Sequence, residues 1–375
     1  MKILALSNCP LVEFQGSGYV IINFCRGLRN LGHEVDLFGP EDFEPFPGLG
    51  GVARSYRQAL GMLPFVLIQM ARKHYDILEF YGGEAWLTIS LLSKLPRRDF
   101  LMVSHSNGLE TQYFETLICY SEAGYIDNPY RKWYQFNQVA LFKKAFDQVD
   151  AIVTVSNNDA KYALNHLYQV PSRIASIDNP LPETFLGLPV NFSREPVIGF
   201  CGSWLPRKGI KTIIADMSRL LQDYPACRLK LIGVRDGFAK GDYFPAAVVS
   251  QIDVLPSVDR QQLTDIYQAL SILILPSFYE SFGLVLAEAM ACGCAVVASR
   301  VGFAASLTHG EEALIIDPPI SPQLYEAVKE LILDETLRLK LAKAGYQRVQ
   351  TLRWPSAISR LETLYSNWLA EIRSK

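Results

Sequence analysis

Two glutamates, Glu280 and Glu288, stand eight residues apart in apolar stretches, where a carboxylate is costly to bury without a partner. Glu280 lies at the turn after the apolar run 272–275, and Glu288 is the single charged residue of the apolar stretch 284–292. Carboxylates accept hydrogen bonds from neighbouring hydroxyls, so each could hold one hydroxylated group. Eight helical residues would span about 12 Å, comparable to a nucleotide-sugar. The pair therefore predicts a site for one elongated ligand, with a ribose at one acid and a sugar at the other.

The turn between the two glutamates adds backbone donors. Phe282, Gly283 and Leu284 begin the expected helix, where the first amide N–H groups lack an intrahelical partner and can meet a phosphate. Gly283 permits close approach of the backbone. A structural explanation stays open, with Glu280 in an exposed loop and Glu288 paired with an arginine of the core.

Two adjacent cations, Arg207 and Lys208, stand in a loop that begins near Ser203 and joins an expected strand at 196–201 to an expected helix at 210–221. Cations at the start of a helix oppose its macrodipole and are mildly unfavourable there. A functional role for Arg207 and Lys208 is therefore favoured over the alternative that they are only solvated surface residues. When a sugar leaves a nucleotide diphosphate, negative charge grows on the departing group, and cations placed there lower the barrier. The loop therefore predicts a diphosphate site.

An α/β fold of two similar halves must position these loops. Expected strands at 2–7 and 34–38 flank an amphipathic helix that follows a loop ending in Gly16, Ser17 and Gly18. The segment 196–232 repeats this strand, loop, helix and strand pattern. Further short apolar runs alternate with helix-like segments, as in parallel sheets covered on both faces, and lie at 77–80, 101–104, 151–155 and 272–275.

The proline-rich and aperiodic segment 179–196 is the expected linker. We therefore expect a first Rossmann-like domain at 1–188, a second at 189–355, and a C-terminal helix at 356–375 that packs back toward the first domain. Two such domains are expected to face each other across a cleft.

Composition narrows the class of protein. The chain has 375 residues, 49% of them hydrophobic and 20% charged, and a formal net charge of -2. These values indicate a folded enzyme and disfavour DNA or RNA as a partner. The seven cysteines form no C-x-x-C pair and are expected to be reduced. The apolar runs at the start and at 60–71 are too short for a signal peptide or a membrane span, so a cytoplasmic location is expected.

Taken together, these residues resemble the family-four retaining glycosyltransferases, which have the two-domain GT-B fold, and the resemblance covers nearly the whole chain. Glu280 and Glu288 are similar to the E-x7-E signature of that family. The segment 202–209 resembles its phosphate loop, and Gly16 resembles its first-domain glycine loop.

The resemblance implies that the first domain, 1–188, binds the acceptor and that the second, 189–355, binds the nucleotide-sugar donor. It also implies a role for each of these residues. Glu280 would orient the donor sugar, Glu288 would hold the ribose hydroxyls, and Lys208 with Arg207 would grip the diphosphate. The amides of residues 282–284 would contact sugar or phosphate. His105, at the end of the strand 101–104, resembles the first-domain histidine that faces the donor sugar; a purely structural role for this histidine stays open.

The chain also departs from the family pattern. Ser203 stands where the family usually has its first phosphate-binding arginine, so Arg207 would have to compensate, and the segment 303–306 differs from the usual sequence after Gly302. The sequence has no Asp-x-Asp, the metal-holding signature of the other large transferase fold. We therefore expect no metal and no cofactor, the nucleotide-sugar being a substrate.

The expected function is retaining transfer of a sugar from a nucleotide-diphosphate donor, with uridine first and guanosine second, to an unidentified hydroxyl acceptor in polysaccharide, glycolipid or other glycoconjugate synthesis. A nucleotide-sugar epimerase and an inactive nucleotide-binding scaffold remain alternatives. A dinucleotide oxidoreductase is disfavoured: Gly16, Gly18 and Asp36 fit its pattern, but Ile21 replaces the third glycine.

Peripheral membrane contact is a further open alternative, and it would suit a lipid-linked acceptor. Cations and aromatic residues alternate at 131–134 and at 142–144, as they do on interfacial helices. A partly exposed helix of the first domain is the favoured explanation of the same pattern.

Overall fold

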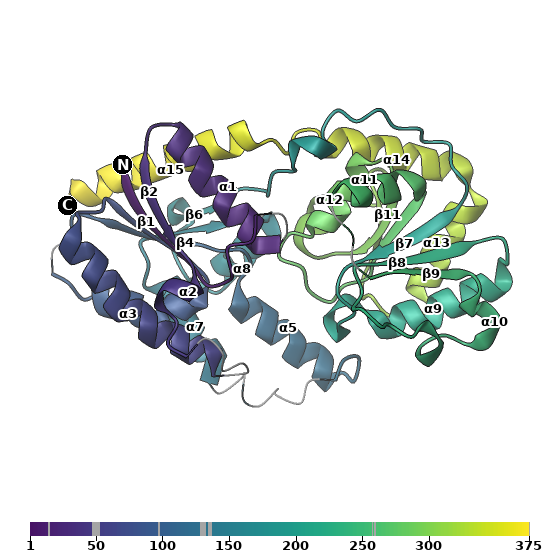
Figure 1. The fold of residues 1–375 in the computed structure, drawn as a ribbon, viewed down its shortest axis with the longest axis horizontal. Helices are drawn as coiled ribbons and strands as arrows, with labels where there is room; N and C mark the ends of the chain where they lie inside the picture. The colour runs from purple at the N-terminus through teal and green to yellow at the C-terminus, as the bar shows by residue number, and fades with distance from the viewer. Residues whose placement is uncertain are drawn as a thin grey trace. The chain divides into compact units, whose positions relative to one another are not determined.

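The computed structural model describes residues 1–13, 16–46, 53–96, 98–127, 133, 137–256, 258 and 260–374. The chain forms two compact units. The first consists of Met1–Glu115, Tyr130–Asn179 and Trp354–Lys375, and the second of Thr116–Pro129 and Pro180–Arg353. Each unit is an α/β structure around its own six-stranded sheet (Figure 1).

The first sheet is parallel, with the strand order β2-β1-β3-β4-β5-β6. Its strands are β1 (Lys2–Ser7), β2 (Glu34–Phe38), β3 (Ile77–Tyr81), β4 (Leu101–His105), β5 (Ala151–Thr154) and β6 (Ile174–Ser176). The helices of this unit are α1 (Gly16–Asn30), α2 (Pro40–Phe43), α3 (Arg54–Arg72), α4 (Trp86–Leu92), α5 (Glu110–Glu122), α7 (Val139–Asp147), α8 (Asn157–Asn165) and α15 (Trp354–Arg373). The α5 helix extends into the second unit.

The second sheet is also parallel and has the order β12-β11-β10-β7-β8-β9. Its strands are β7 (Val197–Cys201), β8 (Arg228–Ile232), β9 (Ile252–Leu255), β10 (Ile272–Leu275), β11 (Ala295–Ser299) and β12 (Leu314–Ile316). Its helices are α9 (Ile210–Asp223), α10 (Ala246–Val249), α11 (Arg260–Ala269), α12 (Leu284–Ala291), α13 (Gln323–Leu333) and α14 (Glu335–Val349).

The central strands of both sheets are buried along their whole length because helices cover both faces (Figure 1). Every residue of β3, β4, β10 and β11 is buried. The expected α/β fold with two parallel sheets is confirmed.

The C-terminal helix α15 belongs to the first unit, as expected from the sequence. It packs on α1 and contacts β4. Tyr365 of α15 is fully buried, and its hydroxyl donates a hydrogen bond of 2.5 Å to Glu79 of β3. The last twenty residues of the chain therefore help to complete the core of the unit formed by its first half.

Two details at the start of the chain differ from the sequence analysis. The helix α1 begins at Gly16, so Gly16 and Gly18 lie in its first turn and not in the preceding loop. Asp36 accepts hydrogen bonds from Lys73 Nζ at 2.6 Å and from the Tyr75 hydroxyl at 2.7 Å. A ribose-binding acid must offer its oxygens to a ligand, so this pairing further disfavours the oxidoreductase alternative.

None of the described helices is long and apolar enough to cross a membrane. Of the two segments considered for peripheral contact, Arg131, Lys132 and Tyr134 lie outside the described residues. In the other, Phe142 is buried in the core of the first unit, and Lys143 pairs with Asp147 at 3.0 Å.

Candidate active site

The strand order of the second sheet places two loops at the point where ligands bind in open α/β sheets. The chain runs from β7 outward to β8 and β9, then crosses to β10 on the other side of β7. The connections after β7 and β10 therefore diverge, and the carboxyl ends of such a strand pair form a ligand-binding crevice. These connections are the segments 202–209 and 276–283, which the sequence analysis singled out.

The two loops meet in a buried ion pair. Lys208 Nζ lies 2.6 Å from Glu280 Oε1, and the Ser277 hydroxyl donates to the same oxygen at 2.6 Å. Lys208 and Glu280 are each only 8% exposed. The alternative that placed Glu280 in an exposed loop is therefore wrong. Since removing either charge would leave the other buried and unpaired, the pair fixes the two loops relative to each other.

Backbone contacts lock the same two loops together. Gly209, between Lys208 and α9, has φ +72°, and a Cβ atom added there would lie 2.0 Å from the carbonyl oxygen of Pro276. The amide of Phe278 donates to the carbonyl oxygen of Arg207 at 2.8 Å. Glycine is therefore required at position 209, and the ion pair rests on a rigid backbone.

The start of α12 lies directly after this loop. Gly283 is its N-cap residue, with no side-chain capping bond, and Leu284 is its first helical residue. Phe282 is buried, its ring lies 5.1 Å from that of Phe303, and its carbonyl oxygen accepts from the Phe303 amide at 2.8 Å. The 3-10 helix Gly302–Ser306, where the sequence departs from the family pattern, thus supports the turn that carries these amides.

Glu288 lies in the interior of α12 and is half-buried. Burial raises the pKa of the Cys201 thiol to about 12, and the negative charge of Glu288 adds to this rise. Burial and the charges of Cys201 and Glu288 likewise raise the pKa of Tyr267. Because Cys201 ends β7, Glu288 lies near the carboxyl end of the same central strand.

The other predicted residues of the phosphate loop lie toward the surface. Ser203 is exposed and Arg207 is half-buried. A pocket of about 350 Å³ adjoins this loop, and its lining consists of Ser203, Trp204, Leu205, Gly233, Arg235 and Tyr243. Arg235, in the loop after β8, was missed by the sequence analysis because no motif marks it. It places a further cation beside Ser203, where this chain lacks the arginine that the family usually has.

In the first unit, the structure places His105 in the interior. Its ring is fully buried, stacks on Tyr81 at 4.9 Å between ring centroids and meets the edge of Phe24 at 4.7 Å. Its Nδ1 lies 2.7 Å from Glu79 Oε1, and its Nε2 has no hydrogen-bond partner among the described residues. Contact of His105 with a donor sugar stays a prediction. A Cβ atom added at Gly16 would meet nothing within 4 Å. The role of Gly16 in donor binding likewise stays a prediction.

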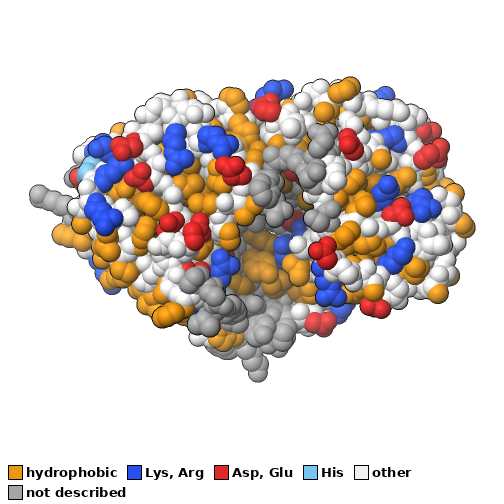
Figure 2. Space-filling view, in the orientation of Figure 1, with side chains coloured by type: hydrophobic (Ala, Val, Ile, Leu, Met, Phe, Trp, Pro, Cys, Tyr) orange, Lys and Arg blue, Asp and Glu red, His pale blue; other side chains and the backbone are white. Residues whose placement is uncertain are grey.

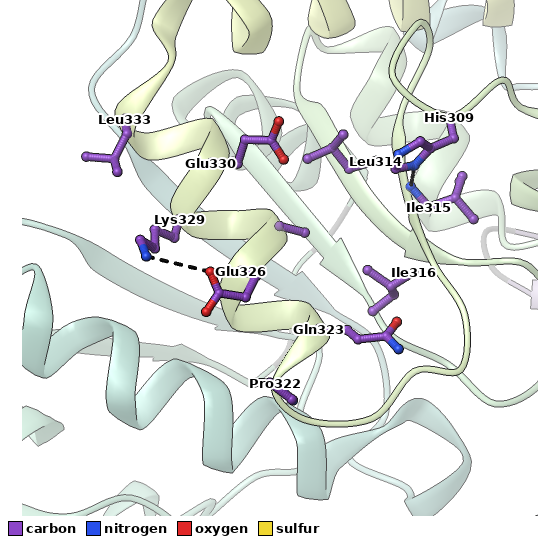
Figure 3. A pocket seen from close by; sticks show the side chains of 11 residues that line it. His309, Leu314, Ile315, Ile316, Pro322, Gln323, Glu326, Lys329, Glu330 and Leu333 are labelled. Carbon is purple, nitrogen blue, oxygen red and sulfur yellow. Dashed lines mark hydrogen bonds and ion pairs between the residues drawn. The ribbon is translucent and has the colours of Figure 1, made fainter.

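A second pocket, of about 470 Å³, lies at the edge of the second sheet between β12 and α13 (Figure 3). His309 Nδ1 accepts from the amide of Ile315 at 2.9 Å, and Lys329 pairs with Glu326 at 3.6 Å. No predicted donor-site residue lines this pocket.

Charges are dispersed on the surface. On the visible face of each unit, cationic and anionic side chains are interspersed (Figure 2). Among the residues that the structure describes, no group of three or more His, Cys, Asp or Glu side chains is placed to hold a metal ion.

Comparison with known protein families shows the family to which the chain belongs. The family model of glycosyl transferases group 1 matches residues 189–348, and that of glycosyltransferase family 4 matches residues 14–184. The chain belongs to these glycosyltransferases. The predicted phosphate loop and both glutamates of this family member lie within the group 1 match, and Gly16 and His105 lie within the family 4 match.

Relatives of this glycosyltransferase include the D-inositol 3-phosphate glycosyltransferase of Corynebacterium glutamicum, 29% identical over 194 residues. That match covers 49% of this chain and 46% of the relative, so the chain spans about half the length of the curated relatives it matches. Sucrose-phosphate synthase from Thermosynechococcus elongatus has a similar structure, with a TM-score of 0.78 at 20% identity, covering 99% of this chain and 100% of that one. Anabaena HepE, solved in complex with UDP and glucose, has a TM-score of 0.68 at 17% identity, covering 98% and 99%. The expected GT-B fold is confirmed.

Proposed function

We propose that the protein transfers a sugar from a nucleotide-diphosphate sugar to a hydroxyl acceptor. The observation that carries this proposal is the buried Lys208–Glu280 ion pair at the switch point of the second sheet, next to the uncapped start of α12. A diphosphate needs cations and amide donors, and a sugar needs a carboxylate that accepts from its hydroxyls. This arrangement supplies all three within two adjoining loops.

Donor binding would exchange the partners of the ion pair. The diphosphate would take over the Lys208 ammonium, with Arg207 and Arg235 as further cations, and Glu280 would then be free to accept from sugar hydroxyls. The protein would thus keep the buried carboxylate neutralised in the empty site and use the same charges in the complex. Glu288, near the end of β7, would hold the ribose hydroxyls. UDP is the first choice of nucleotide because HepE, which shares the fold, was solved with UDP; GDP is the second.

Transfer would proceed with retention of configuration and without a metal ion. The bond between the anomeric carbon and the diphosphate oxygen breaks, and the acceptor oxygen bonds to that carbon on the face the diphosphate leaves. The acceptor proton passes to the departing diphosphate. Lys208 and the first amides of α12 would stabilise the charge that grows on this leaving group. The proposed location is the cytoplasm.

Thermal unfolding of the full chain with excess UDP, GDP, ADP or NAD tests the donor class, since a ligand that binds only the folded state raises the melting temperature. We expect a shift with UDP that is undiminished by EDTA and reduced in Glu288→Ala. A shift with NAD alone would overturn the proposal. Product analysis by NMR then separates transfer, with the anomeric configuration kept, from epimerisation of the donor or absence of turnover.

A further inference from the structure

The second half of α5 belongs to the second unit, although it comes from the first half of the chain. That unit includes Thr116–Pro129 as well as Pro180–Arg353. The described residues of the inserted segment, 116–127, form an arm that consists of the end of α5 and the turn after it. The first half of the sequence therefore contributes to the unit that contains the proposed donor site.

The arm folds back on itself after the last turn of α5. Gly124 has φ +80°, the left-handed conformation that ends many helices, and its amide donates to the carbonyl oxygen of Ser121 at 3.1 Å. The amide of Tyr125 donates to the carbonyl oxygen of Tyr120 at 2.9 Å, and the two rings lie 6.2 Å apart between centroids. The next residue, Ile126, is 4% exposed. The arm is therefore a packed element with two neighbouring tyrosine rings.

Phe278, in the loop after β10, forms an aromatic cluster with these two rings. Its ring centroid lies 4.4 Å from that of Tyr120 and 6.5 Å from that of Tyr125. Phe278 is only 4% exposed. Burial raises the pKa of Tyr120, and the negative charge of Asp317, which follows β12, adds to this rise. The Tyr120 ring thus lies among loops of the second unit, and the arm helps to bury Phe278.

The backbone of Phe278 connects the two loops that form the buried ion pair. Phe278 directly follows Ser277, whose hydroxyl donates to Glu280. Its amide donates at 2.8 Å to the carbonyl oxygen of Arg207, the residue before Lys208. A displacement of Phe278 would therefore move both partners of the ion pair. Since protein interiors are close-packed, removal of a ring that packs on Phe278 would permit such a displacement.

A second contact of the arm lies at the surface. Lys211 Nζ of α9 is 3.2 Å from Asp127 Oδ2, and the two side chains are 58% and 85% exposed. Water and salt screen an ion pair of this kind, so it stabilises little. The aromatic cluster is therefore the contact through which the arm can act on the loop after β10.

Resting on the proposed transferase function, we propose that Tyr120 and Tyr125 are positioning residues of the donor site. They pack on Phe278 and so hold Lys208 and Glu280 in the arrangement that binds the diphosphate. A loop that is already ordered binds its ligand more tightly, because less freedom is lost on binding. Donor binding in turn stabilises the arm, since coupling between two sites is reciprocal.

Titration calorimetry of UDP binding to the full chain tests this proposal. Tyr120→Leu removes the ring, whereas Tyr120→Phe keeps it. The matched control is Tyr113→Leu in the first half of the same helix, where the side chain packs on the core of the first unit. We expect Tyr120→Leu to weaken UDP binding about tenfold, the change that corresponds to the upper range of one aromatic pair. Tyr120→Phe and Tyr113→Leu should bind UDP as the wild type does.

Tyr125→Leu provides a second test that is less exposed to failure of folding, because Tyr125 is 38% exposed. Its ring lies further from Phe278, so we expect UDP binding to weaken by a smaller factor, about threefold. Wild-type UDP affinity in both leucine variants of the arm would refute the proposal. An equal loss of affinity in Tyr113→Leu and Tyr120→Leu would also refute it, because the effect would then not depend on Phe278.

Hydrogen exchange gives a readout that a loss of stability alone would not produce. We expect saturating UDP to slow exchange of the arm amides in the wild type and in Tyr120→Phe, but not in Tyr120→Leu. Exchange of the arm that does not change when UDP binds to the wild type would overturn the coupling. Absence of UDP binding to the wild type would instead refute the proposed donor site.

Discussion

Replacing Lys208 by methionine removes the charge of a buried ion pair while keeping an unbranched side chain of similar volume. Among the residues that the structure describes, the Glu280 carboxylate, 8% exposed, then keeps the Ser277 hydroxyl at 2.6 Å as its donor. Breaking a buried ion pair typically costs about 3 to 5 kcal/mol. Since the Ser277 hydrogen bond to a charged group remains, we expect a cost at the lower end, about 3 kcal/mol.

A double variant at positions 208 and 280 measures the interaction energy between the two side chains. Glu280→Gln alone leaves a buried ammonium and should cost about 2 to 3 kcal/mol, whereas Lys208→Met with Glu280→Gln removes both charges. We expect the double variant to cost about 2 kcal/mol, which leaves a coupling energy of about 3 to 4 kcal/mol between the two positions.

Hydrogen exchange provides a measurement for the second unit alone, because the slowest amides of β7 and β10 exchange through its unfolding. The matched control is Lys211→Met, which removes a 58% exposed cation three residues further along and should cost no more than about 1 kcal/mol. If Lys208→Met were no more destabilising than this control, the buried pair would not hold the two loops together.

Three further predictions concern other parts of the molecule. Burial raises the pKa of Glu110 from an ordinary 4.5 to about 8, so between these values the folded state keeps a proton that the unfolded state releases. The free energy of unfolding should therefore fall from pH 5 to pH 8 by up to about 1.4 kcal/mol per pH unit. Hydrogen exchange of the β4 amides measures this slope, which should be smaller in Glu110→Gln. Gly302 has φ +54°, and a Cβ atom there would lie 2.5 Å from the carbonyl oxygen of Phe282; Gly302→Ala should destabilise the second unit by more than about 1 kcal/mol and weaken UDP binding, both measurable by thermal unfolding. Tyr365→Phe removes the hydroxyl that donates to Glu79 and should cost about 1 to 3 kcal/mol, with faster exchange throughout α15, while unchanged exchange would show that this bond does not anchor the helix.

The sequence was sufficient to predict several strands, because burial of one or both faces leaves a short run rich in apolar residues. β1, β2 and β8 have the expected bounds, and so does β10. Strands β6 and β12, with three residues each, are too short for such a pattern and were not predicted. Strands β9 and β11 were not predicted either.

The loops of the proposed donor site were predicted, but their direct contact was not. Lys208 and Glu280 are 72 residues apart, and only the crossover that puts β10 beside β7 brings them within 2.6 Å. A structural role for His105 was left open, but its partners were not predicted, since Glu79 and Tyr365 come from distant parts of the chain.

The hydrogen-bonded cluster of Asn8, Glu84 and Glu110 in the first unit was missed for a different reason. The three residues come from three separate loops, and each one is an ordinary polar residue after a strand. The pair of glycines that precedes Glu84 directly after the buried strand β3 was a signal in the sequence, because it resembles the glycine-containing loops of the proposed donor site.

Titration calorimetry of UDP binding in the presence of EDTA tests the donor site most directly. We expect one UDP per chain in the wild type, an affinity at least tenfold lower in Lys208→Met, and an unchanged affinity in Lys211→Met. Equal UDP affinity in all three proteins, or no binding of UDP or GDP to the wild type, would contradict the proposal that the loops after β7 and β10 bind a nucleotide-diphosphate donor.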